Sequence, residues 1–363
     1  MRLDCGCRKA LSFDNVFIKP KRSNLPSRDF TLERTLKFKY SNSEWTGVPI
    51  IAANMDHTGT FEMAKSLSSF SCMTAFNKFY SVDQFKEFYQ NNSMYNCWLS
   101  VGMNALDELE ELVNTLRNFV QPKFVPNICI DVANGYTQAF SDYVKEARER
   151  FYYSTIMAGN VASYEQTEQL IISGADVVKV GIGPGSVCTT RRITGVGAPQ
   201  LSAIDECADA AHGLGGMICA DGGCRHPGDI AKAYAAGADF VMLGGMLAGH
   251  EECDGDLVYE DGSVIERPYD EEMIVLKDPV GMRFHGMSSK EAQEQHYGGL
   301  KEYRAAEGKE VVVPYRGKVR DTVIEILGGL RSTMTYIGAQ RLKDIPKCAT
   351  LVLTNEQLNR SFD

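Results

Sequence analysis

The sequence predicts an α/β protein: a single (β/α)8 barrel of eight parallel strands, with an N-terminal extension and an acidic insertion after the eighth strand. One observation is the alternation of short apolar runs with amphipathic helical runs along the chain. A second is that eight such runs suit a closed barrel better than an open doubly wound sheet. A third is the repeated Gly-Ala-Asp at 174–176 and 237–239, where glycine ends a helix and aspartate leads into the next strand.

The barrel elements follow one another in a regular order. The eight expected strands lie at residues 48–54, 71–76, 98–102, 128–133, 155–159, 176–181, 217–221 and 239–243. The expected helices between and after them lie at residues 83–90, 105–119, 136–151, 165–173, 203–212, 227–236 and 320–327. This alternation predicts right-handed crossover connections, which are the ones that parallel sheets use.

Two segments fall outside this pattern. Residues 1–47 precede the first strand and include a basic stretch at 19–23. Residues 251–285 follow the eighth strand and are polar and acidic. We expect the second segment to be a solvated surface excursion whose composition supplies no core face, because charge runs usually lie in solvent. The alternative is a lid over the active face. The acidic residues of this segment include Glu251, Glu252, Asp254, Asp256, Glu260, Asp261, Asp270, Glu271 and Glu272.

Composition excludes several classes of protein. The 363 residues are 44% hydrophobic and 23% charged, which is typical of a soluble globular chain. The net charge of −9 and the lack of a basic stripe argue against a nucleic-acid partner. We also expect no membrane segment and no signal peptide. The 11 cysteines are odd in number and scattered, which predicts reduced thiols in the cytoplasm.

The glycine-rich run at residues 181–197 is the most informative about function. Its five glycines and one proline follow an expected buried strand and let the backbone approach a ligand closely. Within it Cys188 is flanked by Ser186, Thr189 and Thr190. A cysteine on such a loop, with hydroxyls on both sides, is a candidate nucleophile. An isolated cysteine is more often a buried structural residue, but the loop favours the catalytic interpretation.

Glycine pairs follow the seventh and eighth expected strands. Asp221 is followed by Gly222 and Gly223, and Gly244 and Gly245 end the eighth strand. In such barrels phosphate is held after strands seven and eight, and bare glycines let N–H groups point at phosphate oxygens. Either pair alone is often a plain turn, but together they predict a phosphorylated ligand. Asp221 would accept hydrogen bonds from its ribose, and Cys188 would face the ligand's other end.

These motifs resemble those of a known family. Residues 181–190, followed by Gly-Val-Gly-Ala-Pro-Gln at 195–200, resemble the catalytic loop shared by the IMP dehydrogenase and GMP reductase family. The resemblance covers nearly the whole chain. Further matching motifs occur in the same order at residues 13–16, 220–223, 242–249, 286–289, 303–308 and 328–332.

Other features resemble the reductase branch of the family. Residues 77–97 leave room for one helix and not for the regulatory domain that the dehydrogenase usually inserts there. Residues 130–136 and 247–251 resemble the reductase motifs, and residues 304–308 resemble its short form apart from Ala306. No counterpart of the dehydrogenase's long flap is evident. The resemblance implies NADPH-dependent reductive deamination of GMP to IMP, with release of ammonia.

The resemblance also implies three catalytic roles. Cys188 attacks purine C2 and forms a covalent thioimidate, while Thr190 and Glu307 protonate the departing amine. From the residues alone, Thr190 could instead cap a turn and Glu307 could be a surface carboxylate.

The resemblance implies the ligands and the assembly in the same way. They are potassium as the monovalent cation, NADPH as the cofactor, and a homotetramer in which neighbouring subunits contribute some contacts. Potassium would sit on the carbonyls of Gly183, Gly185 and Cys188, with Arg191 nearby. The residues implied to bind GMP are Ser186, Asp221, Gly222, Gly223, Gly244, Gly245, Gly286, Met287, Ser288, Arg304, Ala305, Ala306, Glu307 and Gly308. Those implied to bind the dinucleotide are Ser27, Arg28, Lys78, Asp131, Val132, Ala133, Ile182, Gly183, Met287, Tyr303, Arg304, Ser332, Thr333, Met334 and Thr335.

Three alternatives stay open. One is an IMP dehydrogenase without a regulatory domain, which would run the opposite redox direction with water. Another is a flavin-binding barrel, because glycine-lined phosphate sites after strands seven and eight also hold FMN. The third is a non-catalytic purine nucleotide sensor, against which the set of Cys188, Thr190 and Glu307 argues.

Overall fold

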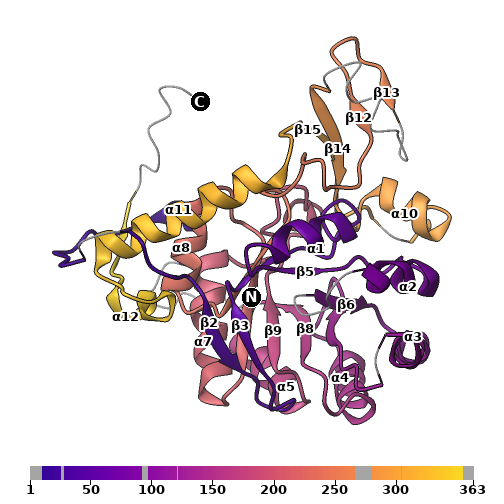
Figure 1. The fold of residues 1–363 in the computed structure, drawn as a ribbon, viewed down its shortest axis with the longest axis horizontal. Helices are drawn as coiled ribbons and strands as arrows, with labels where there is room; N and C mark the ends of the chain where they lie inside the picture. The colour runs from indigo at the N-terminus through magenta and orange to yellow at the C-terminus, as the bar shows by residue number, and fades with distance from the viewer. Residues whose placement is uncertain are drawn as a thin grey trace.

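A computed structural model describes residues 10–25, 28–91, 97–120, 122–265, 279–303 and 305–354. Eight parallel strands close into a barrel in the order β10-β11-β4-β5-β6-β7-β8-β9, with helices around it (Figure 1). The predicted fold class is therefore confirmed, and each strand overlaps one expected run. The strands are β4 Ile50–Ala52, β5 Met73–Ala75, β6 Cys97–Val101, β7 Asn127–Asp131, β8 Ile156–Val161, β9 Val177–Val180, β10 Met217–Asp221 and β11 Phe240–Leu243.

The helices pack their apolar stripes on the outside of the barrel. One of them, α1 (Phe61–Ser68), was not expected. Thr60 is its N-cap, and the Thr60 hydroxyl accepts a hydrogen bond from the Met63 N–H. The helix buries Met63 and Leu67. Short capped helices of this kind give a weak periodic signal in the sequence. The others are α2 Val82–Asn91, α3 Leu106–Phe119, α4 Gln138–Arg150, α5 Tyr164–Ile172, α7 Gln200–Gly213, α8 Pro227–Ala235, α11 Val319–Ile337 and the short α12 Ile345–Cys348. Two further helices lie in connections: α6 Thr190–Thr194 in the loop after β9, and α10 Lys290–Tyr297 between residues 285 and 310. None of the helices in the described part of the chain is long and apolar enough to cross a membrane.

The N-terminal extension closes one end of the barrel. Its strands β2 (Arg34–Lys37) and β3 (Glu44–Gly47) form an antiparallel pair. Phe38 and Trp45 from this pair lie against Phe240 of β11, with ring centroids 6.2 and 5.7 Å apart. The inward side chains of the barrel strands continue this apolar cluster. A ligand site is therefore left to the opposite end, where the strands have their carboxyl termini.

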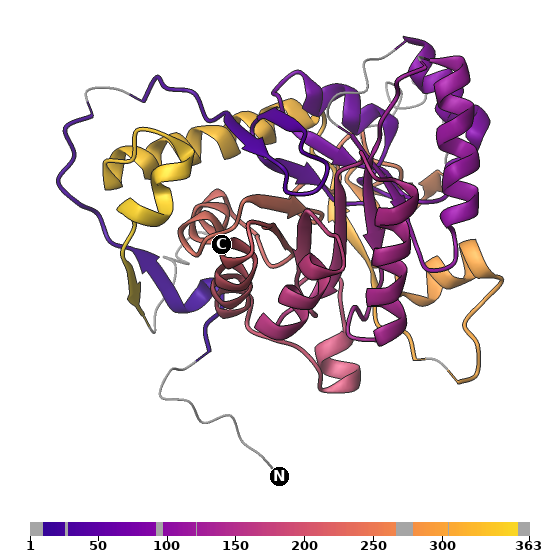
Figure 2. The ribbon, with the colours of Figure 1, turned by 90° about the horizontal axis from the view of Figure 1, so that it is seen from below.

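The two ends of the described chain meet in a small sheet. Strand β1 (Val16–Ile18) pairs antiparallel with β16 (Leu351–Leu353), and Figure 2 shows these indigo and yellow strands side by side. The short 3-10 helix η1 (Phe13–Asn15) precedes β1 and buries Phe13. Both the β2–β3 pair and the segment of η1 and β1 are thus packed against the rest of the protein.

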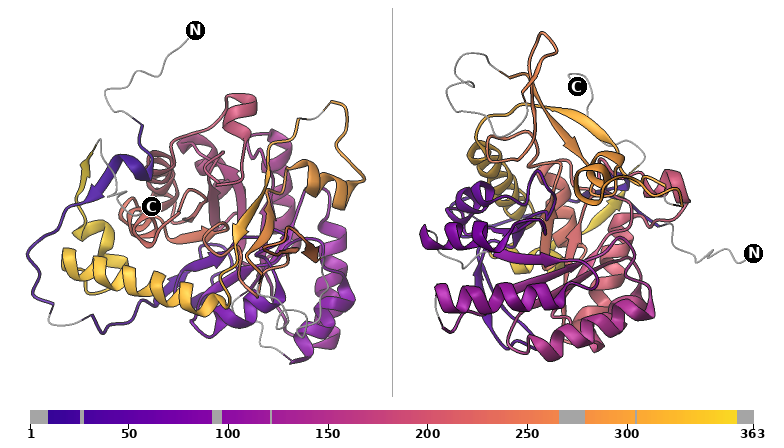
Figure 3. Two further views of the ribbon diagram at one scale, coloured as in Figure 1. Left: turned by 90° about the horizontal axis from the view of Figure 1, so that it is seen from above. Right: turned by 90° about the vertical axis from the view of Figure 1, so that its right-hand side faces the viewer.

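The described part of the acidic segment forms strands, which corrects the expectation that it supplies no core face. β12 (Leu257–Val258), β13 (Val264–Ile265) and β14 (Gly281–His285) join β15 (Glu310–Pro314) in an antiparallel sheet ordered β13-β12-β14-β15, which stands over one end of the barrel (Figure 3). Residues 266–278 lie outside the described residues. The sequence did not predict these strands, because the segment has few apolar residues and many acidic ones, so that its composition is polar. The buried members are Cys253, Leu257, Tyr259, Met282 and Phe284.

Phe284 gives a test of this sheet. It is 2% exposed and clusters with Val187 and Ala248, so that it supports the loop that carries Cys188. We expect Phe284→Ala to lower the free energy of unfolding by about 3–5 kcal/mol, since the change removes buried surface and leaves a cavity. Val312→Ala, on the neighbouring strand at a position 57% exposed, is the matched control and should change it little. Denaturant unfolding at one protein concentration measures both. Equal stabilities would mean that the sheet does not pack on the barrel.

Candidate active site

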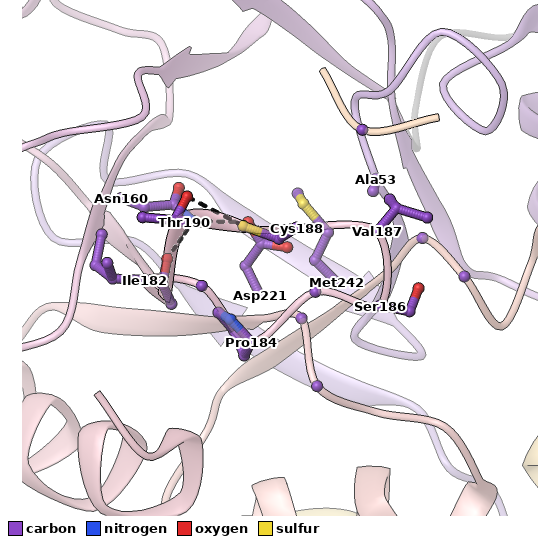
Figure 4. Close-up of a pocket in the computed structure, with 18 of the residues that line it drawn as sticks. Ala53, Asn160, Ile182, Pro184, Ser186, Val187, Cys188, Thr190, Asp221 and Met242 are labelled. Carbon is purple, nitrogen blue, oxygen red and sulfur yellow. Dashed lines mark hydrogen bonds between the residues drawn. The ribbon is translucent and has the colours of Figure 1, made fainter. Parts of the chain in front are cut away.

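A cavity of about 450 Å³ lies at the carboxyl ends of the barrel strands. Its wall includes Asp131 at the end of β7, Asp221 at the end of β10 and Leu243 at the end of β11. The loop after β9, which carries Cys188, forms another side, and Phe284, Gly286, Met287 and Ser288 line the cavity from the end of β14 onward. Figure 4 shows Cys188, Thr190 and Asp221 gathered around this space. The cavity is thus where a barrel of this kind binds its ligand.

Two glycines of this loop are required because other groups lie too close to leave room for a side chain. A side chain at Gly183 (φ +77°) would meet the Arg191 side chain at 2.6 Å. Gly181 leaves room for the carbonyl of Asp221, which a Cβ would approach to 2.1 Å. Arg191 also donates from Nε to the carbonyl of Ile182 at 3.3 Å and from its terminal nitrogen to the carbonyl of Ala198. The side chain of Arg191 therefore ties the two limbs of the loop together.

A hydrogen-bonded chain joins the three residues that were expected to be catalytic. The Cys188 thiol donates to Thr190 Oγ1 at 3.2 Å, and the Thr190 hydroxyl donates to Glu307 Oε2 at 2.8 Å. Thr190 and Glu307 are 117 residues apart in the chain. The side chain of Thr190 thus links the thiol to the carboxyl group, and Glu307 faces the cavity rather than the surface.

Backbone pairing holds this chain of groups together. The Thr189 N–H donates to the carbonyl of Glu307 at 2.9 Å, and the Lys309 N–H donates to the carbonyl of Val187 at 3.0 Å. Cys188 and Gly308 form an antiparallel bridge between these two bonds. Gly308 must be small there, because a Cβ would lie 2.8 Å from the Ser289 nitrogen.

The expected phosphate end also assembles. Gly222 and Gly223 both have φ +88°, a left-handed conformation that glycine adopts without strain. At Gly245 a Cβ would meet Ser186 Oγ at 2.7 Å, so the two approach closely from different loops. All of these residues line the same cavity as Gly244. Exposed peptide N–H groups in such turns suit a phosphate.

The structure brings together one group of the expected ligand residues and leaves others elsewhere. Ser27 and Arg304 lie outside the described residues. Met334 is buried in the core on α11, so its side chain cannot reach a ligand in this conformation. Expected residues that line the cavity are Asp131, Val132, Ala133, Ile182, Gly183, Gly185, Ser186, Cys188, Thr190, Arg191, Asp221, Gly222, Gly223, Gly244, Gly245, Gly286, Met287, Ser288 and Glu307. Those that are not among its lining residues are Arg28, Lys78, Tyr303, Ala305, Ala306, Gly308, Ser332, Thr333, Met334 and Thr335.

Sequence reasoning missed further residues of the cavity. Lys179 is the most informative of them, because a lysine inside the apolar strand β9 must have buried partners. Its position in the run Val-Val-Lys-Val was the available signal. The other missed lining residues are Ser12, Phe13, Asp14, Ala53, Asn54, Met55, Asn160, Gly181, Pro184, Val187, Gln200, Cys224, Arg225, Met242, Leu243 and Phe284.

A buried cluster of histidines adjoins the cavity. Asp56 Oδ2 lies 2.7 Å from His296 Nε2 and 3.3 Å from His285 Nε2, and His285 Nδ1 lies 3.1 Å from His57 Nε2. Burial, and next the neighbouring His285, lower the pKa of His57 to about 4. His57 is therefore neutral in the folded protein at pH 7.

This shift predicts acid sensitivity. The folded pKa lies below the unfolded value of 6.5, so the unfolded state takes up the proton first. The contribution of neutral His57 to the free energy of unfolding is fully present above pH 6.5 and is lost as the pH falls towards 4. The loss is about 3 kcal/mol, at 1.36 kcal/mol per pKa unit. We expect His57→Gln to flatten this part of the stability curve, measured by denaturant unfolding from pH 7.5 to 4.5.

His212 is the control of opposite sign. Its hydrogen bond to Asp239, at 2.7 Å, raises the pKa of His212, so its contribution is lost as the pH rises. His212→Gln should leave the acid slope in place. An acid slope unchanged in His57→Gln would contradict the assignment to His57.

Among the described residues, no group of three or more His, Cys, Asp or Glu side chains is placed to hold a metal ion. The expected potassium site consists of backbone carbonyl oxygens, which are a different kind of ligand from these side chains. One of them, the carbonyl of Gly185, already accepts from the Cys188 N–H at 3.2 Å.

The fold and the cavity define an α/β barrel that presents a cysteine, linked through a hydroxyl to a carboxyl group, beside glycine-rich turns at the ends of β10 and β11. The model of the IMP dehydrogenase / GMP reductase domain matches residues 10–360, and the chain belongs to this family. Proteins named GMP reductase from Escherichia coli O81 (strain ED1a) and from Shigella boydii serotype 4 (strain Sb227) are each 53% identical to it over 361 residues. These alignments cover 97% of this chain and 97% of each relative. The resemblance inferred from the motifs is confirmed.

Proposed function

We propose that this chain catalyses the NADPH-dependent reductive deamination of GMP to IMP, with release of ammonia. The observation that carries the proposal is the chain of hydrogen bonds from the Cys188 thiol through Thr190 to Glu307. A nucleophile at C2 needs a proton donor for the departing amine, and this arrangement supplies both at one place. The naming of the two relatives supports the same reaction.

The residues act in a defined order in this proposal. Glu307 takes the thiol proton through Thr190, and the Cys188 thiolate attacks C2 of GMP. The same hydroxyl then returns a proton to the amine, which leaves as ammonia while a thioimidate to Cys188 remains. Bound NADPH supplies the hydride for C2. Cys188 then leaves as a thiolate that keeps the electron pair of the C2–S bond and takes up a proton from solvent, and IMP and NADP⁺ are released.

Binding roles follow the placement of the cavity residues. The glycine pairs and Ser186 would hold the phosphate, and Asp221 would accept from the ribose. Asp131, Val132, Ala133, Ile182 and Gly183 would face the dinucleotide. Of the expected dinucleotide residues, Arg28, Lys78, Tyr303 and Ser332 to Thr335 are not among the lining residues of this cavity. We propose a homotetramer in which a neighbouring subunit contributes some of these contacts.

Two finer proposals accompany the reaction. We place a potassium ion on the carbonyls of Gly183, Gly185 and Cys188, since backbone carbonyls are the oxygen donors that this cation accepts. We place the protein in the cytoplasm, because the described cysteines are free thiols.

Parallel assays test the proposed function. NADPH absorbance should fall when GMP is added, and NAD⁺ should not be reduced with IMP. The reverse pattern would identify an IMP dehydrogenase. A yellow purified protein would favour the flavin barrel, and GMP binding without turnover would favour a nucleotide sensor.

A further inference from the structure

We propose that Lys179 is a positioning residue, whose single ammonium group holds the Asp131 and Asp221 carboxylates in the geometry that places GMP and the nicotinamide end of NADPH against each other. The inference rests on the proposed function, because that function assigns Asp221 to GMP and Asp131 to NADPH. Lys179 Nζ lies 2.6 Å from Asp131 Oδ1 and 2.8 Å from Asp221 Oδ2. Its side chain is only 4% exposed.

Barrel geometry explains how one lysine reaches both carboxylates. Asp131 on β7 pairs in register with Gly159 on β8, which pairs with Lys179 on β9. Gly159 has no side chain between them, and a Cβ there would lie 2.6 Å from the Lys179 Cβ. Asp221 ends the next strand, β10. Lys179 on β9 therefore connects the carboxyl ends of β7 and β10, which lie on opposite sides of its own strand.

The carboxylate on the GMP side is oriented from two directions. Asp221 Oδ2 accepts from Lys179 and also from Asn160 Nδ2 at 2.8 Å. Asn160 is itself held by the carbonyl of Gly181 at 2.9 Å. Asp221 remains 21% exposed, on the wall of the cavity. These contacts fix the plane of the carboxylate that a ribose hydroxyl would meet.

The charges around Lys179 are consistent with this role. Burial alone would lower the pKa of Lys179, but Asp131 and then Asp221 raise it well above its usual value. Burial likewise raises the pKa of Asp131, and Lys179, aided by Lys78, brings it below its usual value. The thiols of Cys129 and Cys219 also face this group; burial raises the pKa of Cys129 to about 12 and the pKa of Cys219 well above its usual value, so both remain neutral. The Lys179 ammonium thus keeps the Asp131 carboxyl group ionised, although it also contacts a second aspartate.

Steady-state kinetics of Lys179→Met and Lys179→Arg test the proposal across pH 6 to 9. In Lys179→Met we expect KM to rise for both GMP and NADPH, by about 10-fold or more, because each carboxylate loses a hydrogen bond to a charged group. The acid limb of the kcat/KM profile should move to higher pH, since the effect of burial, which raises the pKa of Asp131, is then opposed only by the smaller effects of Lys78 and Asn54. Lys179→Arg should keep the wild-type acid limb while both KM values rise, because it retains the charge in a different shape.

Lys232→Met is the matched control. Lys232 is also a buried lysine near an aspartate, Asp229 at 3.4 Å, but it is not among the residues that line the cavity. It should lower the melting temperature and leave both KM values and the pH profile unchanged. If Lys179→Met behaves as Lys232→Met does, Lys179 is structural and the inference is wrong. If Lys179→Met does not fold, unchanged KM values in Lys179→Arg overturn it. A wild-type protein that does not oxidise NADPH with GMP would instead refute the proposed function itself.

Discussion

Cys188→Ala should abolish turnover and leave GMP binding intact. The phosphate, ribose and base would still meet Ser186, the glycine pairs and Asp221, whereas the bond to C2 has no substitute nucleophile. NADPH oxidation measures turnover, and calorimetric titration with GMP measures binding.

Cys348→Ala provides the matched control. Cys348 is also a half-buried free thiol, but it lies at the end of α12 and is not among the residues that line the cavity. It should keep the wild-type rate. If Cys188→Ala retains more than about a few per cent of activity, covalent catalysis through Cys188 is wrong.

Glu307→Gln should slow ammonia release more than hydride transfer. An amide cannot take the thiol proton through Thr190 and return it to the amine, and positioned acid–base groups contribute about 10²–10⁴-fold. Single-turnover kinetics separate the steps, with ammonia measured in quenched samples and hydride transfer by NADPH absorbance.

Glu310→Gln is the control for charge alone. Glu310 lies three residues further along, on β15, where it faces Arg283 at 3.9 Å. Its loss should leave both steps unchanged. Equal slowing of the two steps in Glu307→Gln would contradict the role of that carboxyl group in protonating the departing amine.

The barrel could be predicted because each strand is a compact apolar run between clear helical runs. The loop of Cys188 could be predicted as well, because its glycines are visible in the sequence. The structure shows why glycine is needed at Gly181 and Gly183, where a Cβ would collide with the Asp221 carbonyl and the Arg191 side chain. The meeting of Thr190 with Glu307 could be expected only by resemblance to the family. A contact between residues 117 apart leaves no trace in local composition.

Other parts could not be predicted for physical reasons. In the acidic segment, Met282 and Phe284 alternate over a strand of five residues, too short for its period to emerge among charged neighbours. The partners of Lys179 could not be predicted, because Asp131 and Asp221 come from distant parts of the chain. Burial and pairing of a charge are tertiary properties.

The fate of the NADPH hydride tests the central claim most directly. GMP is incubated with the enzyme and with NADPH that carries deuterium at both hydrogens of nicotinamide C4, and the purine product is analysed by mass spectrometry and NMR. The account predicts IMP with one deuterium at C2, formed together with ammonia. IMP without deuterium, or a product that keeps the amino group, would contradict it.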